Sequence, residues 1–258
     1  VLIGEGEVGF NKFLKKPRKG ILKREALITD LDKIKFPARE LLKNKKYLWS
    51  VPKKGIRPMT SFMTSRGCPF MCTFCSQHIL FGRKMRYRSI GNIMEELTLI
   101  KDKYKINHLS MLDDTLGLDK KRTFELCDNI RKEKLDITFE GYTRVNVITE
   151  ELLRKLKKAG LNRLSFGVES GDQNILNATK KGTNLKQIRR AYEIADKVGI
   201  ETRMSIIFGL PGETTKTIKK TIKFMKSLKC DQADVNVGTP FPGTEYYEQA
   251  KKGIGGMK

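Results

Sequence analysis

The 258-residue sequence lacks the features that mark secreted or membrane-spanning chains. It contains no run of 18 or more apolar residues, so no transmembrane helix is predicted. The chain starts at Val1 and not at Met, and no charged segment followed by an apolar one opens it. The five cysteines are an odd number, and three of them lie within eight residues, which disfavours a framework of disulfide pairs. We therefore expect a cytoplasmic protein, and the start resembles a cut through a longer one.

Acidic residues are also scarce, because 29 Asp and Glu stand against 52 Lys and Arg, giving a formal net charge of +23. Such an excess raises nucleic acid or an anionic membrane as a partner. The excess is mostly Lys, however, spread along the helical segments, and no Arg-rich block with interleaved aromatic residues occurs. This dispersion indicates a solvated surface, so a nucleic-acid partner is not expected.

From about residue 56 the chain repeats a β-rich run, a loop and a helical stretch. The six predicted strands cover residues 59–64, 108–112, 138–142, 163–167, 201–208 and 233–237. The five predicted helices between them cover residues 90–104, 120–134, 150–159, 184–198 and 214–228. This alternation predicts parallel βαβ units in an α/β fold, as a partial (β/α)6 TIM-like barrel, with an open doubly wound sheet as the competing architecture. In either, ligands gather at the carboxyl ends of the strands.

The two ends of the chain differ from this repeat. Residues 1–55 hold an apolar start, the turn-like run Gly4-Glu5-Gly6-Glu7 and proline-punctuated connections, including residues 52–58. We interpret residues 1–55 as the tail of an upstream domain plus a linker, and residues 56–250 as the barrel. The glycine-rich residues 251–258 are expected to be frayed or truncated.

Three cysteines directly follow the first predicted strand, at Cys68, Cys72 and Cys75. Thiolates at positions i, i+4 and i+7 of one loop can surround a single iron–sulfur cube, whereas ferredoxins and structural zinc sites supply four ligands. Three ligands leave one metal position open for chemistry, unless a distant residue completes the set. The available residues are Cys127, Cys230, His78 and His108. Cys127 and Cys230 are expected to pack as free thiols and His108 to be structural, and His78 is the nearest alternative.

The Cys-x3-Cys-x2-Cys spacing, with the aromatic Phe74 before the last cysteine, resembles the radical S-adenosylmethionine (SAM) superfamily. The resemblance covers nearly the whole chain. It implies that Cys68, Cys72 and Cys75 hold a [4Fe-4S] cluster whose open iron binds the SAM amino and carboxylate groups. It further implies that the reduced cluster cleaves SAM to methionine and a 5′-deoxyadenosyl radical, which abstracts hydrogen from a small-molecule substrate. An electron donor of low potential, of the flavodoxin or ferredoxin type, is implied as well.

Further motifs resemble the SAM-binding segments of this family. Asp113 and Asp114 stand where the family contacts the SAM amino group, usually with a Gly-Gly-Glu-like segment, and Asp114 could instead cap its loop. In the segment 164–171, Glu169 and Ser170 resemble the ribose-contacting site. The resemblance implies ribose hydroxyls as the hydrogen-bond donors to Glu169.

Two cations and a glycine turn complete the expected site. Lys181 matches a basic position that the family associates with the SAM carboxylate, and Arg144 is a second cation that could instead pair with Glu140 or an Asp. Gly209 and Pro211 lie in a Gly-Leu-Pro-Gly-Glu-Thr turn similar to the one that passes close to the adenine.

Three amino-terminal motifs resemble the junction between a cobalamin-binding domain and the barrel: Gly4-Glu5-Gly6-Glu7, Thr29-Asp-Leu-Asp32 and Phe36-Pro37-Ala-Arg39. The resemblance implies a cobalamin-linked branch that methylates unactivated carbons or closes rings, with cobalamin bound by residues upstream of Val1. A methylthiotransferase is a second possibility, but that branch needs three more amino-terminal cysteines and an RNA-binding domain. A zinc-filled, non-catalytic binding module is a third. Phe139, Tyr142, Asn236 and Thr239 are expected at the barrel mouth, and their types do not distinguish one substrate from another.

Overall fold

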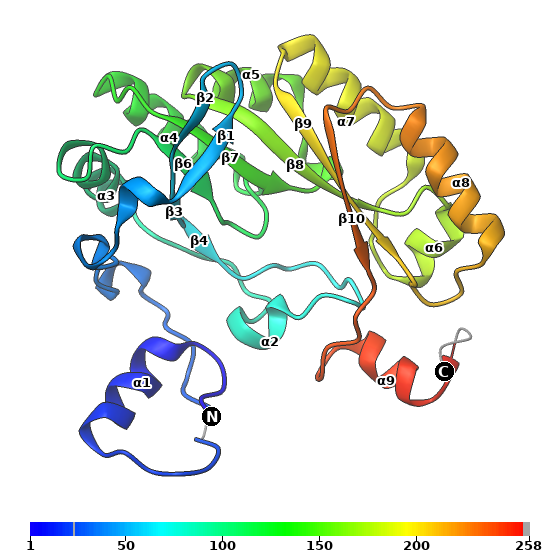
Figure 1. Ribbon diagram of the computed structural model, residues 1–258, viewed down its shortest axis with the longest axis horizontal. Coiled ribbons are helices and arrows are strands. Elements are labelled where there is room, and N and C mark those ends of the chain that lie inside the picture. Colours follow the sequence, from blue (N-terminus) through cyan, green and yellow to red (C-terminus); the bar gives the residue numbers. More distant parts are fainter. Residues whose placement is uncertain (23, 255–258) are drawn as a thin grey trace.

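The computed structural model describes residues 1–22 and 24–254, and its core is a curved six-stranded sheet (Figure 1). The strand order is β10-β9-β8-β7-β6-β3, and every neighbouring pair is parallel. The strands are β3 (Thr60–Phe62), β6 (His108–Met111), β7 (Thr138–Thr143), β8 (Leu161–Glu169), β9 (Glu201–Phe208) and β10 (Gln232–Val237). The edge strands β3 and β10 do not pair with each other, so the barrel is partial, as predicted.

Five helices cover the outer face of this sheet (Figure 1). They are α3 (Ile90–Asp102), α4 (Lys120–Lys132), α5 (Glu150–Lys158), α7 (Leu185–Val198) and α8 (Thr215–Lys226). Each begins directly after a Ser, Asp, Thr or Asn whose side chain accepts a backbone N–H of the first turn. The apolar stripes of α3, α4, α5 and α7 are buried against the sheet, as at Ile93 and Leu97, whereas α8 buries only Thr221 fully. Phe166 of β8 meets Tyr192 of α7 edge-to-face at 5.1 Å. The hydrophobic core therefore lies between sheet and helices, outside the barrel lumen.

A β-hairpin closes the amino end of the barrel. It consists of β1 (Leu48–Val51) and β2 (Gly55–Pro58), where the sequence predicted a linker. Trp49 Nε1 donates to Glu140 Oε2 at 3.2 Å, and Arg163 Nη1 donates to the carbonyl of Ser50 at 3.0 Å. Arg163 also pairs with Glu140 at 3.1 Å and with Glu201 at 2.6 Å. The boundary predicted at residue 55 thus falls inside a hairpin that packs on the barrel.

The amino-terminal segment forms a small lobe beside the barrel (Figure 1). Helix α1 (Gly6–Lys15) begins within the Gly-Glu-Gly-Glu run, where the sequence indicated a strand end and turn, and residues 1–3 form no strand. The buried carboxylate of Glu5 pairs with Arg66 at 3.1 Å and with Arg86 at 2.9 Å, which ties the lobe to the segment after β3. Three single-turn 3-10 helices follow: η1 (Leu31–Lys33), η2 (Arg39–Leu41) and η3 (Asn44–Lys46).

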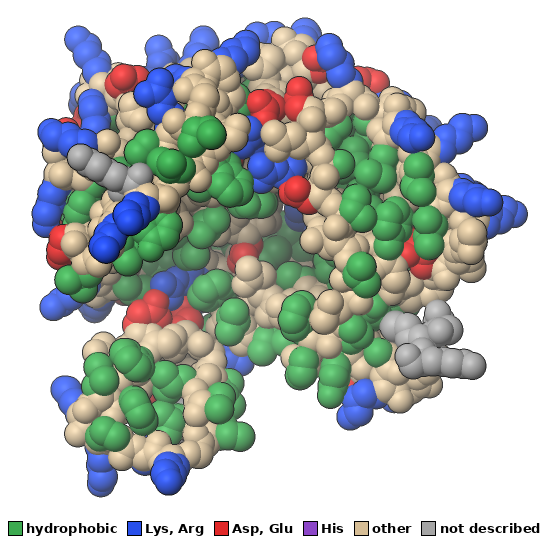
Figure 2. All heavy atoms as spheres, in the orientation of Figure 1, with side chains coloured by type: hydrophobic (Ala, Val, Ile, Leu, Met, Phe, Trp, Pro, Cys, Tyr) green, Lys and Arg blue, Asp and Glu red, His purple; other side chains and the backbone are tan. Residues whose placement is uncertain are grey.

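Short elements surround the carboxyl end of the sheet. They are β4 (Ser65–Arg66), α2 (Gln77–Phe81), β5 (Arg86–Tyr87), η4 (Val145–Val147), α6 (Gln173–Ala178) and α9 (Glu245–Lys251). Of the tail predicted at residues 251–258, residues 255–258 lie outside the described part. No helix in the described ranges is both long and apolar enough to cross a membrane. On the face shown in Figure 2, Lys and Arg side chains are spread around the outer rim.

Candidate active site at the carboxyl ends of the strands

The cysteine loop lies over the carboxyl end of the sheet and is held there by backbone hydrogen bonds. Cys68 N–H donates to the carbonyl of Gly82 at 3.4 Å, and Thr73 N–H donates to the carbonyl of Thr179 at 3.0 Å. Gly67, which precedes the first cysteine, has φ of +97°, and a Cβ there would lie 2.4 Å from the carbonyl oxygen of Lys84. Only glycine fits this close approach in this backbone conformation. The loop therefore takes its course from its own backbone contacts.

Asp113 anchors the start of the cysteine loop. Its carboxylate is 3% exposed and accepts from the backbone N–H of Thr64 at 2.6 Å and of Ser65 at 3.2 Å. It also accepts from the hydroxyls of Thr64 and Ser65. Both carboxylate oxygens are therefore engaged by the loop. The structure gives Asp113 a structural role, where the sequence had offered it as an acceptor for the SAM ammonium.

Of the adjacent residues Asp113 and Asp114, Asp114 is the one with a carboxylate oxygen that no described residue engages. Its Oδ2 is buried and has no hydrogen-bond partner among the described residues. Burial, followed by the nearby charge of Asp113, raises the pKa of Asp114 from its ordinary value of 3.8 to about 6. A cation placed beside this carboxylate would restore its ionised form. Asp114 is thus the member of the pair that fits an ammonium ligand.

The three loop thiols lie close enough to influence one another. Burial raises the pKa of the Cys75 thiol, and the charges of Cys72, Cys68 and Asp114 raise it further. Among residues 1–22 and 24–254, no three His, Cys, Asp or Glu side chains converge to hold a single metal ion. A four-iron cluster does not require such convergence, because each thiolate binds a different iron.

Three of the other candidate ligands lie away from this loop, and His78 lies in the helix that follows it. Cys127 is 1% exposed in the core, and burial raises its pKa to about 12. Cys230 Sγ donates to the carbonyl of Gln232 at 2.9 Å, and His108 contacts Thr138 at 2.9 Å, both at the amino ends of strands. His78 lies in α2, half-buried, and the pKa of its ring is lowered mainly by burial.

Arg144 reaches the cysteine loop from the end of β7. Its Nη1 donates to Cys72 Sγ at 3.2 Å, and its Nη2 donates to the carbonyl of Lys181. The alternative considered from the sequence, a structural pair with Glu140, does not form, because Glu140 lies at the amino end of the barrel with Arg163. The guanidinium is 5% exposed.

Glu169 and Lys181 form a buried ion pair at the barrel mouth, with Lys181 Nζ 2.7 Å from Glu169 Oε1. A register shift between Gly167 and Glu169 interrupts the β8–β9 ladder, and Glu169 has φ of +67°. A Cβ at residue 167 would lie 2.5 Å from Glu169 Oε1, so glycine leaves room for this pair. A non-glycine residue in the left-handed region is strained, and such strain is frequent at functional sites.

The glycine turn after β9 is fixed by two side chains. Gly209 N–H donates to Glu213 Oε2 at 2.5 Å, and Tyr246 Oη donates to the carbonyl of Gly209 at 2.6 Å. The backbone N–H of Tyr246 donates to the carbonyl of Thr73, so this tyrosine joins the turn to the cysteine loop. Tyr246 was not predicted as a site residue, because its contacts with Gly209 and Thr73 join residues far apart in the sequence. Pro211 is buried in the turn.

Ser170 lies behind the site. It is fully buried, and its hydroxyl contacts Thr221 Oγ1 at 3.1 Å and accepts from Asp172 N–H at 3.2 Å. The bond to Thr221 links β8 to α8. Phe74 lies nearer the mouth, with its ring centroid 6.0 Å from Lys181 Nζ.

The lumen above the hairpin is polar. Tyr142 is exposed there, and Asn236 donates to the backbone of β9. Thr239, just beyond β10, contacts its own strand through the carbonyl of Val237. Phe139, expected at the mouth, is instead 1% exposed in the core, because strand alternation turns it toward the helices and its neighbour Glu140 toward the lumen. The prediction for Phe139 was wrong.

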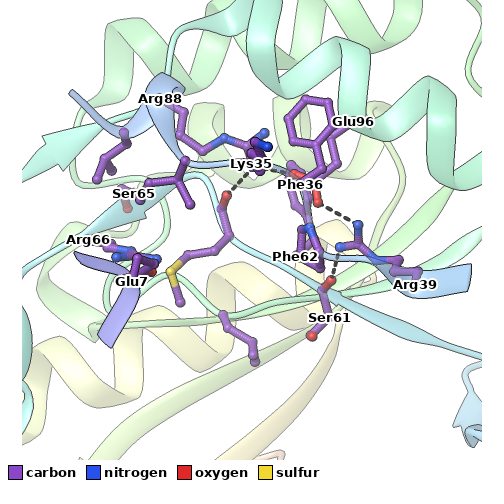
Figure 3. Close-up of a pocket in the computed structure, with 15 residues that line it drawn as sticks. Glu7, Lys35, Phe36, Arg39, Ser61, Phe62, Ser65, Arg66, Arg88 and Glu96 are labelled. Atoms are coloured by element: carbon purple, nitrogen blue, oxygen red, sulfur yellow. Dashed lines mark hydrogen bonds and ion pairs between the residues drawn. The ribbon is translucent and has the colours of Figure 1, made fainter. Parts of the chain in front are cut away.

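A cavity separates the linker from the first barrel strand (Figure 3). Its volume is about 350 Å³. Its walls combine apolar side chains such as Phe36 and Phe62 with the cations Arg39 and Arg88, both paired with Glu96 (Figure 3). The guanidinium of Arg88 lies 5.4 Å from each of the two phenylalanine rings. A cavity of this size, with an apolar wall and a few charged groups, suits part of a small-molecule ligand.

The side chains at the mouth fit the cofactors that the sequence indicated. Three thiols share one loop, and one of them already accepts a hydrogen bond from a cation. Buried oxygen atoms without partners among the described residues occur in three of the segments that follow the strands: Thr73 Oγ1 in the cysteine loop, Asp114 Oδ2 after β6 and Glu213 Oε1 in the turn after β9. Buried polar atoms normally have partners, so these three indicate a ligand with donors to offer.

A family model described as the radical SAM superfamily matches residues 62–225. The chain belongs to the radical SAM superfamily. The predicted enzyme class is therefore confirmed. The chain is 37% identical over 268 residues to an uncharacterised methyltransferase of Pyrococcus horikoshii, covering 97% of this chain and 57% of that protein. It is 31% identical over 227 residues to an anaerobic magnesium-protoporphyrin IX monomethyl ester cyclase of Rubrivivax gelatinosus, covering 87% of this chain and 40% of that one.

The radical SAM barrel is also present in solved structures. The methyltransferase TsrM of Kitasatospora setae, solved with cobalamin and a [4Fe-4S] cluster bound, superposes with a TM-score of 0.69 at 20% identity, over 75% of this chain and 39% of that one. This match confirms the fold. The chain spans about half the length, or less, of these relatives.

Proposed function

We propose that this radical SAM domain cleaves SAM reductively at a [4Fe-4S] cluster held by Cys68, Cys72 and Cys75, and that its enzyme uses the resulting radical for methylation or oxidative ring closure. The observation that carries the proposal is the position of the three cysteines. They lie on one loop over the carboxyl end of a partial barrel, beside buried acceptors that lack partners among the described residues.

The bound cluster and SAM supply the chemistry: one electron from the cluster cleaves the sulfonium and yields a 5′-deoxyadenosyl radical. The chain supplies orientation and exclusion of water. Asp114 accepts from the SAM ammonium, and Glu169 accepts from the ribose hydroxyls, with Lys181 holding that carboxylate in place. Gly209 and Pro211 provide the backbone that lies against the adenine. Phe74 lines the same mouth.

Two of the residues first considered as SAM contacts act indirectly in this scheme. Asp113 fixes the start of the cysteine loop through Thr64 and Ser65. Ser170 fixes the end of β8 against α8 through Thr221. The polar side-chain atoms of Asp113 and Ser170 are already engaged by the protein, so these residues orient neighbours that face the cofactors and do not contact the cofactors themselves.

We further propose that residues 1–55 end an upstream cobalamin-binding domain. The named methyltransferase and cyclase relatives support this branch, and so does the cavity beside the linker, where a ligand carried by an upstream domain would meet the barrel. We place the enzyme in the cytoplasm, with a low-potential flavodoxin or ferredoxin as electron donor and a small molecule as substrate.

Cleavage of SAM tests this function directly. The chain is reconstituted with iron and sulfide without oxygen, reduced with dithionite, mixed with SAM, and assayed for 5′-deoxyadenosine. We expect a cluster whose spectrum changes on SAM addition and 5′-deoxyadenosine that is lost in Cys72→Ala. Cys230→Ala is the matched control, because this thiol lies at the other end of the barrel. The control variant should keep both the spectral change and the formation of 5′-deoxyadenosine. A loaded cluster that ignores SAM would refute the proposal.

A further inference from the structure

Arg144 carries a buried positive charge that no carboxylate of the described residues compensates. Its guanidinium donates to Cys72 Sγ at 3.2 Å, to the carbonyl of Lys181 and to Asn146 Oδ1 at 3.3 Å. Within the described ranges it forms no ion pair at 4.0 Å or less with an Asp or Glu. The nearest acidic pair at the mouth is already formed between Glu169 and Lys181. The sulfur is therefore the one acceptor of Arg144 that can take a negative charge.

The position of this guanidinium is fixed from several sides. Its Cζ lies 3.8 Å from the centroid of the Phe70 ring, so an aromatic face of the cysteine loop covers it. The backbone carbonyl of Phe70 accepts from Arg83 Nη1 at 2.6 Å, and this hydrogen bond fixes the backbone that carries the ring. Arg144 itself follows β7 and precedes the short helix η4. These contacts hold the guanidinium in one position beside Cys72 Sγ.

We propose that Arg144 acts on the cluster through Cys72, donating an N–H to the ligand sulfur and raising the reduction potential of the cluster. The inference rests on the proposed function, since it presumes that Cys72 binds iron. An iron-bound thiolate still accepts hydrogen bonds, and such bonds, together with net charge and burial, set cluster potentials. Reduction adds one negative charge beside the guanidinium. The cation therefore favours the reduced form, more strongly in a buried site than in water.

The midpoint potential of the cluster measures this effect without SAM and without turnover. Wild type, Arg144→Lys and Arg144→Gln are reconstituted without oxygen, their iron and sulfide are counted, and each is titrated while the reduced cluster is followed by EPR. We expect the most negative potential in Arg144→Gln and an intermediate one in Arg144→Lys, which keeps the charge but not the planar fork. Lys180→Gln is the control, because that exposed cation at the same mouth is paired with Glu245, and its potential should equal wild type.

A second measurement detects the contact in the wild type itself, with Arg144→Lys as its control. Wild type is grown with arginine labelled with nitrogen-15 in the guanidinium, and pulsed EPR of the reduced cluster is recorded. We expect a nitrogen-15 coupling that disappears in Arg144→Lys. No coupling in wild type, or an unchanged potential in fully loaded Arg144→Gln, would overturn the inference. A cluster that loads but does not cleave SAM refutes the proposed function alone, whereas a wild-type chain that takes up no cluster refutes both.

Discussion

At the amino end of the barrel the buried Arg163 forms ion pairs with the buried Glu140 and the half-buried Glu201, whereas at the carboxyl end Arg144 and Asp114 form no ion pair with any described residue. Both ends are polar and both are largely shielded from water. The amino end is covered by the β1–β2 hairpin, which adds Trp49 and the carbonyl of Ser50 to the network. The carboxyl end is covered by the cysteine loop. The difference separates a network that stabilises the fold from a set of groups prepared for ligands.

Removing the central cation of the amino end should have the largest effect on stability. Arg163→Ala leaves the 4%-exposed Glu140 side chain without its ion pair, and we expect a loss of about 3–5 kcal/mol in the free energy of unfolding. Urea denaturation of the metal-free chain measures it. Arg154→Ala is the control, because its pair with Glu150 is on the surface and should contribute less than about 1 kcal/mol. A loss of similar size in both variants would contradict the contrast between the two ends.

Distorting the carboxyl end should cost less stability and more function. Gly67→Ala places a Cβ 2.4 Å from the Lys84 carbonyl oxygen at a φ of +97°. We expect a loss of about 2–3 kcal/mol, together with severalfold lower iron uptake on reconstitution. Gly91→Ala is the matched control. It lies in α3 with nothing within 4 Å of the added Cβ, so it should gain up to about 1 kcal/mol and load iron normally. Normal iron uptake by Gly67→Ala would show that the close approach is not required.

Much of this contrast was visible in the sequence, but not its details. The six strands and five covering helices were predicted to within a few residues, because alternating apolar patterns and capping residues are local signals. The hairpin was missed, because Pro52 and Gly55 indicate a turn but do not indicate that the flanking residues pair as strands and pack on the barrel. Helix α2 was missed because five residues carry little periodicity. The cysteines were found by their spacing.

The assignment of individual polar side chains required tertiary contacts. Asp113 and Asp114 are adjacent and chemically identical, and only the fold shows that the loop engages one and leaves an oxygen of the other free. Arg144 and Cys72 are 72 residues apart, so no local pattern links them. The bulge that gives Glu169 its positive φ is likewise invisible before the register of β8 and β9 is known.

The titration of Asp114 sharpens the comparison, because its pKa is raised to about 6 in the folded chain. The carboxyl of Asp114 ionises at lower pH in the unfolded chain than in the folded chain. The free energy of unfolding therefore falls as the pH rises from 3.8 to about 6, and this group changes it no further above about 6. Asp114→Asn should therefore raise the free energy of unfolding of the metal-free chain by about 1–2 kcal/mol near neutral pH, a value reduced because Asp114 is partly exposed. At about pH 4 the substitution should leave the free energy of unfolding unchanged. Urea denaturation at both pH values checks this. The exposed Asp136→Asn should show no such difference, and an equal gain at both pH values would refute the assignment.

The smallest expected effect concerns reactivity and leaves stability unchanged. Burial raises the pKa of Cys127 to about 12, so its thiolate is rare at neutral pH and its sulfur is covered. Iodoacetamide should modify Cys127 at least about tenfold more slowly than the half-buried Cys75 or Cys230 in the native, metal-free chain. Timed alkylation with peptide mass analysis measures the rates. Equal rates for all three would mean that the helical layer opens as readily as the mouth.

Strands β3 and β10 are the margins of a sheet that never closes into a ring. A closed barrel widens only by breaking a ladder of hydrogen bonds, whereas this sheet can uncoil slightly and keep every bond it has. Segments that pack along the two margins therefore help to set the width of the barrel lumen. Exchanging those segments between homologous chains would change that width while leaving the hydrogen bonds of the sheet intact.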